Sequence, residues 1–171
     1  MTTIKKATQK DIRALSRKLL TLLEDKNSQI YQENVAKFGI PEEYVKKAFA
    51  EEKMLEAAAT GKATFYLARE NTEIVGFAQT IQKDASIVEL DRIIIFPKHA
   101  RKGIGTQLLH QALVDQKEKG INTVIVNTGK EEIQARRFYE KNGFKQIKEA
   151  MIKAPWGKKL ILVTYQLHVK R

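Results

Sequence analysis

The chain has 171 residues, 43% of them hydrophobic, which is enough apolar material for the core of one domain spanning 1–171. Its 31 lysines and arginines exceed its 20 acidic residues and give a net charge of +11, which favours nucleic acid, an anionic surface or a phosphorylated ligand as partner. The absence of cysteine excludes disulfides, thiolate metal sites and a cysteine nucleophile. Since no segment resembles a signal peptide or a membrane-spanning helix, we expect a cytoplasmic protein without a membrane partner.

The first residues predict a short strand around Ile4 and then a helix. Thr8 and Asp11 have the spacing of a helix N-cap and the third helical residue, so the helix should begin near Gln9 and end near Glu24. Apolar residues then recur at intervals of three and four, as on the buried face of a helix: Ile12, Leu15, Leu19, Leu22 and Leu23.

A second helical region extends from about 30 to 59. The residues 38–40 should break it in two, Pro41 suits a first helical turn, and Gly61 should end it. Its apolar face predicts packing against the core, and the alternative is a lid over a substrate.

The rest of the chain predicts strands at 63–70, 74–82, 87–96, 123–126, 144–148 and 160–169, and helices at 103–119 and 132–141. Three strands in succession predict an antiparallel meander, whereas a strand, a helix and a strand predict a parallel pair. We therefore expect an α/β (α+β) fold with a central mixed, mostly antiparallel twisted sheet of about seven strands, flanked by about four helices.

The most informative stretch, 89–109, reads as strand, glycine-containing loop and helix. Gly103 and Gly105 let the backbone approach a ligand, and the first amides of the helix are unpaired at the positive end of its dipole. Cationic and hydroxyl donors accompany them: Arg101, Lys102 and Thr106. The loop favours a phosphate site, although the glycines could serve only the backbone angles of a turn. A P-loop and a Rossmann site are excluded because their motifs are absent.

Part of this stretch and one segment further along the chain match the motifs of a known family. Residues 100–105 read Ala-Arg-Lys-Gly-Ile-Gly, and 135–144 read ARRFYEKNGF. In this order they resemble the GNAT superfamily of N-acetyltransferases, whose motifs are Arg or Gln, two residues, Gly, one residue, Gly or Ala, and then A-x-x-F-Y-E-x-x-G-F. The resemblance covers about 65–147. The chain length, the helical insert and the hairpin around 155–157 are similar to PaiA-type polyamine acetyltransferases.

The resemblance implies acetyl-CoA as cosubstrate, without a metal. The main chain of 93–95 would pair with the pantetheine arm like an added strand, and the amides of 101–106 would hold the pyrophosphate. Asn127 would contact the cofactor or merely end its strand. The implied cofactor-binding residues are Ile93, Ile94, Ile95, Arg101, Lys102, Gly103, Ile104, Gly105, Thr106, Asn127, Gln134 and Phe138.

Catalysis needs a base, because an ammonium has no lone pair, and a proton donor for the departing thiolate. Glu89 corresponds to the acidic base of some relatives, and Asp91 follows it on the same face, yet either could form a cross-strand salt bridge. The resemblance gives Tyr139 the role of proton donor, and the alternative is that it only packs beside Phe138.

The chain is therefore expected to transfer acetyl to a primary amine by direct attack in a ternary complex. The acceptor is a polyamine, another small amine or a peptide amine, and the protein could form a homodimer. Ala100 and Gln134 depart from the residues common in the family, which suggests a sensor without turnover as one alternative. A second alternative is a nucleic-acid-binding domain. It is disfavoured because glutamates separate the lysines and no known nucleic-acid-binding motif appears. The three histidines do not have the spacing of metal ligands, and we expect them at the surface or in loops: His99, His110 and His168.

Overall fold

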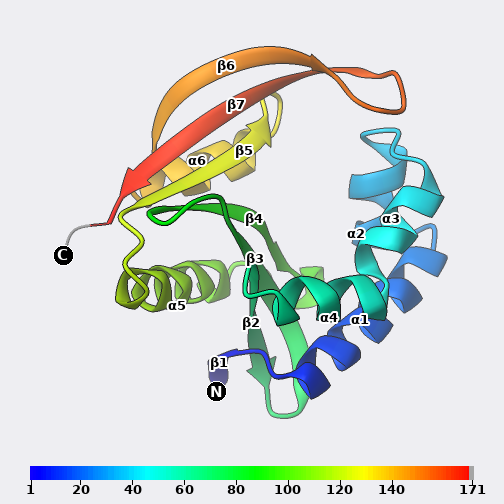
Figure 1. The fold of residues 1–171 in the computed structure, drawn as a ribbon. Helices are drawn as coiled ribbons and strands as arrows, with labels where there is room; N and C mark the ends of the chain where they lie inside the picture. Colours follow the sequence, from blue (N-terminus) through cyan, green and yellow to red (C-terminus); the bar gives the residue numbers. More distant parts are fainter. Residues whose placement is uncertain (170–171) are drawn as a thin grey trace.

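One seven-stranded sheet, in the order β1-β2-β3-β4-β5-β7-β6, organises residues 1–169, which the computed structural model describes (Figure 1). Residues 170 and 171 of the predicted domain lie outside the described residues. The strands are β1 (Thr2–Lys6), β2 (Ala63–Glu70), β3 (Glu73–Gln82), β4 (Ile87–Ile95), β5 (Thr123–Gly129), β6 (Lys145–Lys153) and β7 (Lys159–His168). The α-helices are α1 (Gln9–Glu24), α2 (Gln29–Tyr31), α3 (Glu42–Phe49), α4 (Glu51–Ala59), α5 (Ile104–Glu118) and α6 (Ile133–Lys141).

Strand pairing follows the chain order from β1 to β5, after which β7 lies between β5 and β6. Throughout residues 1–169, neighbouring strands run antiparallel except β4 and β5, which are parallel and joined through α5. The structure confirms the meander β2–β3–β4 and the parallel pair, as well as the mixed, mostly antiparallel sheet. The strands β5 and β6 continue to Gly129 and Lys153, beyond their predicted ends at 126 and 148, because pairing with β7 extends each of them.

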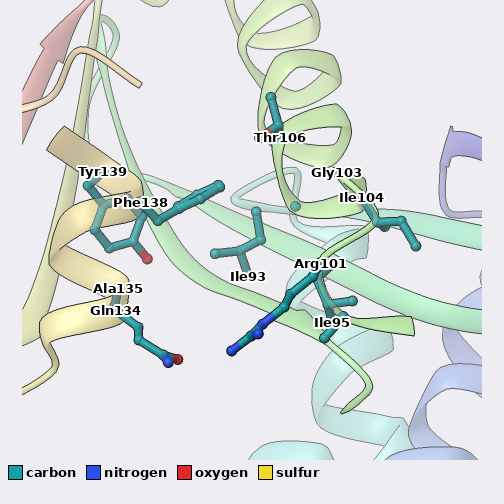
Figure 2. A pocket seen from close by; sticks show the side chains of 12 residues that line it. Ile93, Ile95, Arg101, Gly103, Ile104, Thr106, Gln134, Ala135, Phe138 and Tyr139 are labelled. Atoms are coloured by element: carbon teal, nitrogen blue, oxygen red, sulfur yellow. The ribbon is translucent and has the colours of Figure 1, made fainter. Parts of the chain in front are cut away.

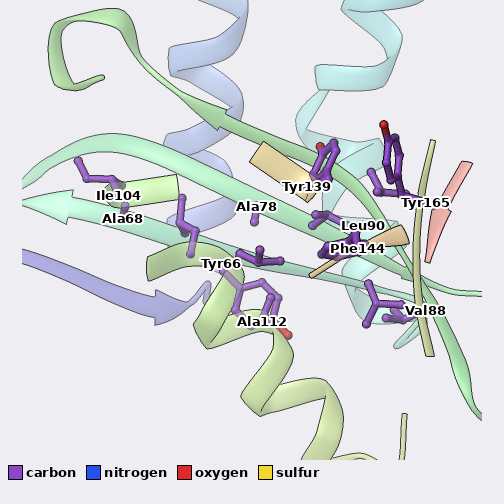
Figure 3. Close-up of a cluster of buried hydrophobic side chains, with 14 of the residues drawn as sticks. Tyr66, Ala68, Ala78, Val88, Leu90, Ile104, Ala112, Tyr139, Phe144 and Tyr165 are labelled. Atoms are coloured by element: carbon purple, nitrogen blue, oxygen red, sulfur yellow. The ribbon is translucent and has the colours of Figure 1, made fainter. Parts of the chain in front are cut away.

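Helices cover both faces of the sheet, and a separate hydrophobic core forms on each. Alternate residues of β2 serve the two cores: Phe65 packs with α1, α3 and α4 on what we call the α1 face, and Tyr66 packs with α5 and α6 on the α5 face. Figure 3 shows the second core, where Tyr66, Tyr139 and Tyr165 lie among aliphatic side chains. Both faces of the central strands are thus buried, which explains their nearly continuous apolar sequence.

The helix α1 begins as predicted. The Thr8 hydroxyl accepts a hydrogen bond from the Asp11 N–H, and the Asp11 carboxylate accepts one from the Thr8 N–H, which completes a capping box. Arg69 of β2 adds an ion pair to Asp11 at 2.9 Å. Burial alone would raise the pKa of Asp11, but the hydrogen bonds from Thr8 and Arg69 outweigh it and hold the pKa below its usual value.

The second helical region is divided more often than the sequence predicts. The break at 38–40 is confirmed, and before it α2 continues into a π-helical turn over Gln32–Ala36. A further break lies at Ala50, whose extended backbone (φ −62°, ψ 137°) separates α3 from α4. Alanine favours helices, so the sequence gives no sign of this break, which lets both short helices pack on α1.

His99 corrects a prediction. It was expected at the surface or in a loop, but it lies in a 3-10 helix over Pro97–His99 and is only 7% exposed. Its ring is covered by the β2–β3 hairpin, and its Nδ1 atom lies 3.4 Å from the carboxylate of Glu70.

Candidate active site

The parallel strands β4 and β5 separate after three residues and leave a gap in the sheet. Residues 87–89 pair with 123–125, after which β4 stays with β3 and β5 stays with β7. Since the Phe96 N–H donates to β3, the alternation of amides along a strand directs the N–H groups of Ile93 and Ile95 into the gap. This edge of β4 can therefore accept an added strand.

A β-bulge at Asp91 changes which side chains of β4 face α5. The β3–β4 register shifts by one residue there, so Asp91 has no partner in the ladder. Leu90 packs on the α5 face before the bulge, and Ile93 and Ile95 do so after it. Glu89, next to Leu90, points to the α1 face. The bulge thus places apolar side chains on one side of the gap and a carboxylate on the other.

The loop between β4 and α5 combines left-handed backbone with unpaired helix amides. Arg101 and Gly103 have φ angles of 64° and 79°, and Gly103 is the N-cap of α5 without a side-chain hydrogen bond. Successive amides in such a turn form an anion-binding concavity, and the first amides of α5 have no acceptor within the helix. The loop is therefore suited to bind a phosphate group.

A cavity of about 390 Å³ lies between this loop, β4 and α6 (Figure 2). Its lining is Ile93, Ile95, Ala100, Arg101, Gly103, Ile104, Gly105, Thr106, Gln134, Ala135, Phe138 and Tyr139. A Cβ atom at Gly105 would lie 3.5 Å from the Phe138 ring, so a larger side chain would fill the cavity. Figure 2 shows the Arg101 guanidinium extending into this space on the side of Gln134.

Tyr139 places a protonated hydroxyl at this cavity. The side chain is 7% exposed, and its ring meets Phe138 and Phe144 edge-on at centroid distances of 5.6 Å. Burial raises the pKa of Tyr139 to about 12, so the hydroxyl keeps its proton at neutral pH. Because Tyr139 makes no side-chain hydrogen bond within residues 1–169, its proton is available to a ligand.

On the opposite face, Glu89 belongs to a chain of polar side chains across three strands. Thr164 donates to the Asn127 oxygen at 2.6 Å, and the Asn127 amide donates to Glu89 at 3.1 Å. The Glu89 carboxylate, 15% exposed, also pairs with Lys83 at 3.0 Å, and this hydrogen bond raises the pKa of Lys83. Asp91 pairs instead with Arg92, at 3.3 Å.

Nine of the predicted cofactor residues line the first cavity: Ile93, Ile95, Arg101, Gly103, Ile104, Gly105, Thr106, Gln134 and Phe138. Three do not. The side chain of Ile94 packs on the α1 face, and the ammonium of Lys102 lies 3.5 Å from Glu70. Asn127 lines a second cavity.

This second cavity, about 610 Å³, is here called the hairpin cavity. Its lining is Lys37, Phe38, Ile40, Asn127, Thr128, Gly129, Lys130, Glu131, Glu132, Ala135, Trp156, Lys158, Lys159, Leu160, Ile161 and Leu162. The β6–β7 hairpin meets the segment before α3 there, as Figure 1 shows: Trp156 donates to the Phe38 carbonyl at 3.3 Å and Lys158 to the Lys37 carbonyl at 2.9 Å. Ala135 lines both cavities, so they adjoin.

Sequence reasoning missed Lys83, Thr164 and the hairpin cavity. Lys83 meets Glu89 locally, across the turn between β3 and β4. Thr164 meets Asn127 only through the pairing of β5 with β7, and the hairpin cavity depends on a contact between Trp156 and Phe38, which are 118 residues apart. The turn around Trp156 was the sole sequence signal for them.

The family model for the acetyltransferase (GNAT) domain matches residues 26–155. An uncharacterised N-acetyltransferase of Mycobacterium tuberculosis is 33% identical over 78 residues, which are 46% of this chain and 50% of that protein. The ribosomal protein bS18 alanine N-acetyltransferase of Haemophilus influenzae is 36% identical over 80 residues, 46% of this chain and 52% of that protein. The chain therefore spans about half the length of the curated relatives it matches.

The fold is shared with solved structures. The PaiA N-acetyltransferase of Thermoplasma acidophilum, in complex with coenzyme A, superposes with a TM-score of 0.69 at 21% identity, over 98% of this chain and 99% of that one.

No helix within residues 1–169 has the length and apolar character needed to cross a bilayer. In the same part of the chain, no three acidic or histidine side chains group in a way that could hold a metal ion.

Proposed function

This chain belongs to the GNAT acetyltransferase family, and we propose that it transfers an acetyl group from acetyl-CoA to a primary amine by direct attack in a ternary complex. The observation that carries the proposal is the open edge of β4 beside the unpaired amides of α5. An extended chain ending in a diphosphate fits both features at once: the edge offers hydrogen bonds to its amides, and the loop offers them to its phosphates.

The residues present fit coenzyme A. Ile93, Ile95 and Phe138 give the first cavity apolar walls for the pantetheine arm, while the amides of 101–106 and the Arg101 guanidinium suit its pyrophosphate. Arg101 reaches into the cavity from the position after Ala100, so it can supply a charge that alanine lacks. Bound acetyl-CoA would supply an electrophilic thioester.

Two side chains on opposite sides of the gap have the chemistry that the transfer needs. Glu89 can take the proton of the incoming ammonium, directly or through water, and Asn127 holds its carboxylate in place. The Tyr139 hydroxyl, still protonated at neutral pH, can give a proton to the departing thiolate. The gap between β4 and β5 connects the two faces, so an amine at Glu89 can reach a thioester held on the α5 side.

The proposal is tested by thiol release from acetyl-CoA, measured with polyamines, small monoamines, amino acids and peptides as acceptors. Calorimetry with coenzyme A provides a second readout. We expect binding of coenzyme A and turnover with at least one amine. Binding without turnover on any amine would favour a sensor, and the absence of binding would show the proposal to be wrong.

A further inference from the structure

The β6–β7 hairpin carries lysines that have no acidic partner. From 150 to 171 the chain contains neither aspartate nor glutamate. Lys153 and Lys159 lie directly opposite each other on the two strands. The ion pairs of residues 1–169 involve neither of them, nor Lys158. Like charges directly opposite destabilise a sheet, so folding alone does not account for this cluster.

Two of these lysines line the hairpin cavity. Its charged lining consists of Lys37, Lys130, Lys158, Lys159, Glu131 and Glu132. Lys37 and Lys130 already have carboxylates at 2.7 and 3.2 Å, from Glu132 and Glu149 respectively. The hairpin end therefore holds an excess of positive charge, which attracts an anion and repels a second ammonium.

The hairpin cavity also has apolar walls. They are formed by Phe38, Ile40, Trp156, Leu160 and Leu162. Such walls keep water away and strengthen an ion pair formed beside them. The same walls suit an aliphatic or peptide segment more than a polycation.

The two ends of the cavity are well separated along β7. Thr164, which bonds Asn127, is five residues from Lys159, a distance of about 16 Å along an extended strand. The odd spacing starts the two side chains on opposite faces of β7, and Lys159 lines the cavity from the end of the strand. Lysine side chains shorten this span but do not close it. An amine near Glu89 and an anion at Lys159 must therefore belong to an elongated molecule, longer than a single α-amino acid group.

From this arrangement we infer that the acceptor is an elongated primary amine that carries a carboxylate far from the amine. Lys159 binds the carboxylate together with Lys158, whose ammonium also donates to the Lys37 carbonyl, and the amine lies at the Asn127 end of the cavity. The inference rests on the proposed function, because it names the acceptor of that reaction. Two sources share this chemistry: a small ω-amino carboxylate, and a peptide N-terminus with a carboxylate a few residues along.

Three acceptors of similar length test the inference: 6-aminohexanoate, hexylamine and 1,6-diaminohexane. We expect kcat/KM, measured by thiol release, to be about tenfold higher for 6-aminohexanoate than for hexylamine, which is the effect of one charge-assisted hydrogen bond. It should be lowest for 1,6-diaminohexane, because its second ammonium is repelled by the lysines. Ala-Ala-Glu-amide against Ala-Ala-Gln-amide tests the peptide source. The better of 6-aminohexanoate and the acidic peptide identifies which source the cavity prefers.

The double variant Lys158→Gln, Lys159→Gln should raise KM for the carboxylate about tenfold and change KM for hexylamine far less. Lys159→Gln alone, which keeps the hydrogen bond from Lys158 to the Lys37 carbonyl, should shift the preference in the same direction and separates charge from the closure of the hairpin. Lys148→Gln, an exposed lysine of β6 outside the cavity, is the matched control and should change neither KM. Turnover with equal or greater preference for the diamine, or a variant that keeps the preference, would overturn the inference and leave the acetyltransferase proposal standing. Calorimetry of 6-aminohexanoate and hexylamine decides independently of turnover, since equal affinities would also overturn it.

Discussion

Asn127 on β5 donates a hydrogen bond to the Glu89 carboxylate on β4, at 3.1 Å, beside the point where the two strands separate. Its amide cannot easily rotate, because Thr164 donates to the Asn127 oxygen at 2.6 Å. The carboxylate is therefore held at the entrance to the gap by groups on both β5 and β7.

Glu89→Gln should lower kcat about 100-fold at neutral pH, the lower end of what a general base contributes. The amide can still accept the hydrogen bond from Asn127, so folding should be unaffected. Activity should recover as the pH rises toward the pKa of the acceptor amine, because the amine then arrives without its proton. Asp91→Asn is the control, and a pH–rate profile in which that variant loses more than Glu89→Gln would assign the base to Asp91.

Tyr139→Phe should also lower kcat about 100-fold. The affinity for coenzyme A should hardly change, because the ring still packs between Phe138 and Phe144. The matched control is Tyr66→Phe, a buried tyrosine outside the first cavity whose hydroxyl donates to Asp115 at 2.5 Å. That variant should lose stability but keep its turnover. Full activity of Tyr139→Phe on every accepted amine would remove the tyrosine from the mechanism.

Arg101→Gly should stabilise the fold and weaken cofactor binding. The φ angle of 64° at Arg101 is strained for a side chain but not for glycine, so the free energy of unfolding should rise by up to about 1 kcal/mol. The loss of the guanidinium should weaken coenzyme A binding about tenfold.

Asn71→Gly, at a φ angle of 58° in the β2–β3 turn, is the control for this backbone effect. Chemical denaturation should show a smaller gain, since asparagine tolerates this conformation, with unchanged cofactor affinity by calorimetry. If Arg101→Gly bound coenzyme A as tightly as the parent, the side chain would have no role in holding it.

Alkaline pH should destabilise the fold through its buried tyrosines. Burial raises the pKa of Tyr139 from 10 to about 12, and burial with the Asp115 hydrogen bond raises that of Tyr66. For a raised folded-state pKa, the stabilisation is complete below the unfolded value and is lost as the pH rises through the folded value. The free energy of unfolding should therefore fall above pH 10, and less steeply in Tyr139→Phe. Urea denaturation at a series of pH values above 10 measures this free energy. The same pH dependence in the parent and in Tyr139→Phe would contradict the raised pKa of Tyr139.

Much of the fold follows from local patterns. The capping pair Thr8 and Asp11 locates the start of α1, and the glycine loop before α5 with its flanking strand and helix indicates the phosphate site. Each of these signals lies within a few residues of the chain, because helix capping and phosphate binding by loop amides both depend on neighbouring residues.

What the sequence could not predict depends on pairing between distant segments. The bulge at Asp91 is set by how β4 aligns with β3, and the chain from Thr164 to Glu89 exists only because β7 inserts between β5 and β6. His99 is buried against the β2–β3 hairpin. The polar residues around His99 in the sequence give no sign of this burial. The hairpin cavity likewise requires Trp156 to meet Phe38.

The short contact between β4 and β5 has a mechanical consequence. Within residues 1–169, the only strand pairing between the β1–β4 part of the sheet and the β5–β7 part involves three residues on each strand. A cofactor lying along the unpaired stretch of β4 and β5 would contact both strands and act as a crosslink between the two parts of the sheet. Its binding should therefore delay thermal unfolding, by about 2.7 kcal/mol of added stability at one hundred times its dissociation constant. The amides of Ile93 and Ile95 should then exchange their hydrogens far more slowly than in the free protein.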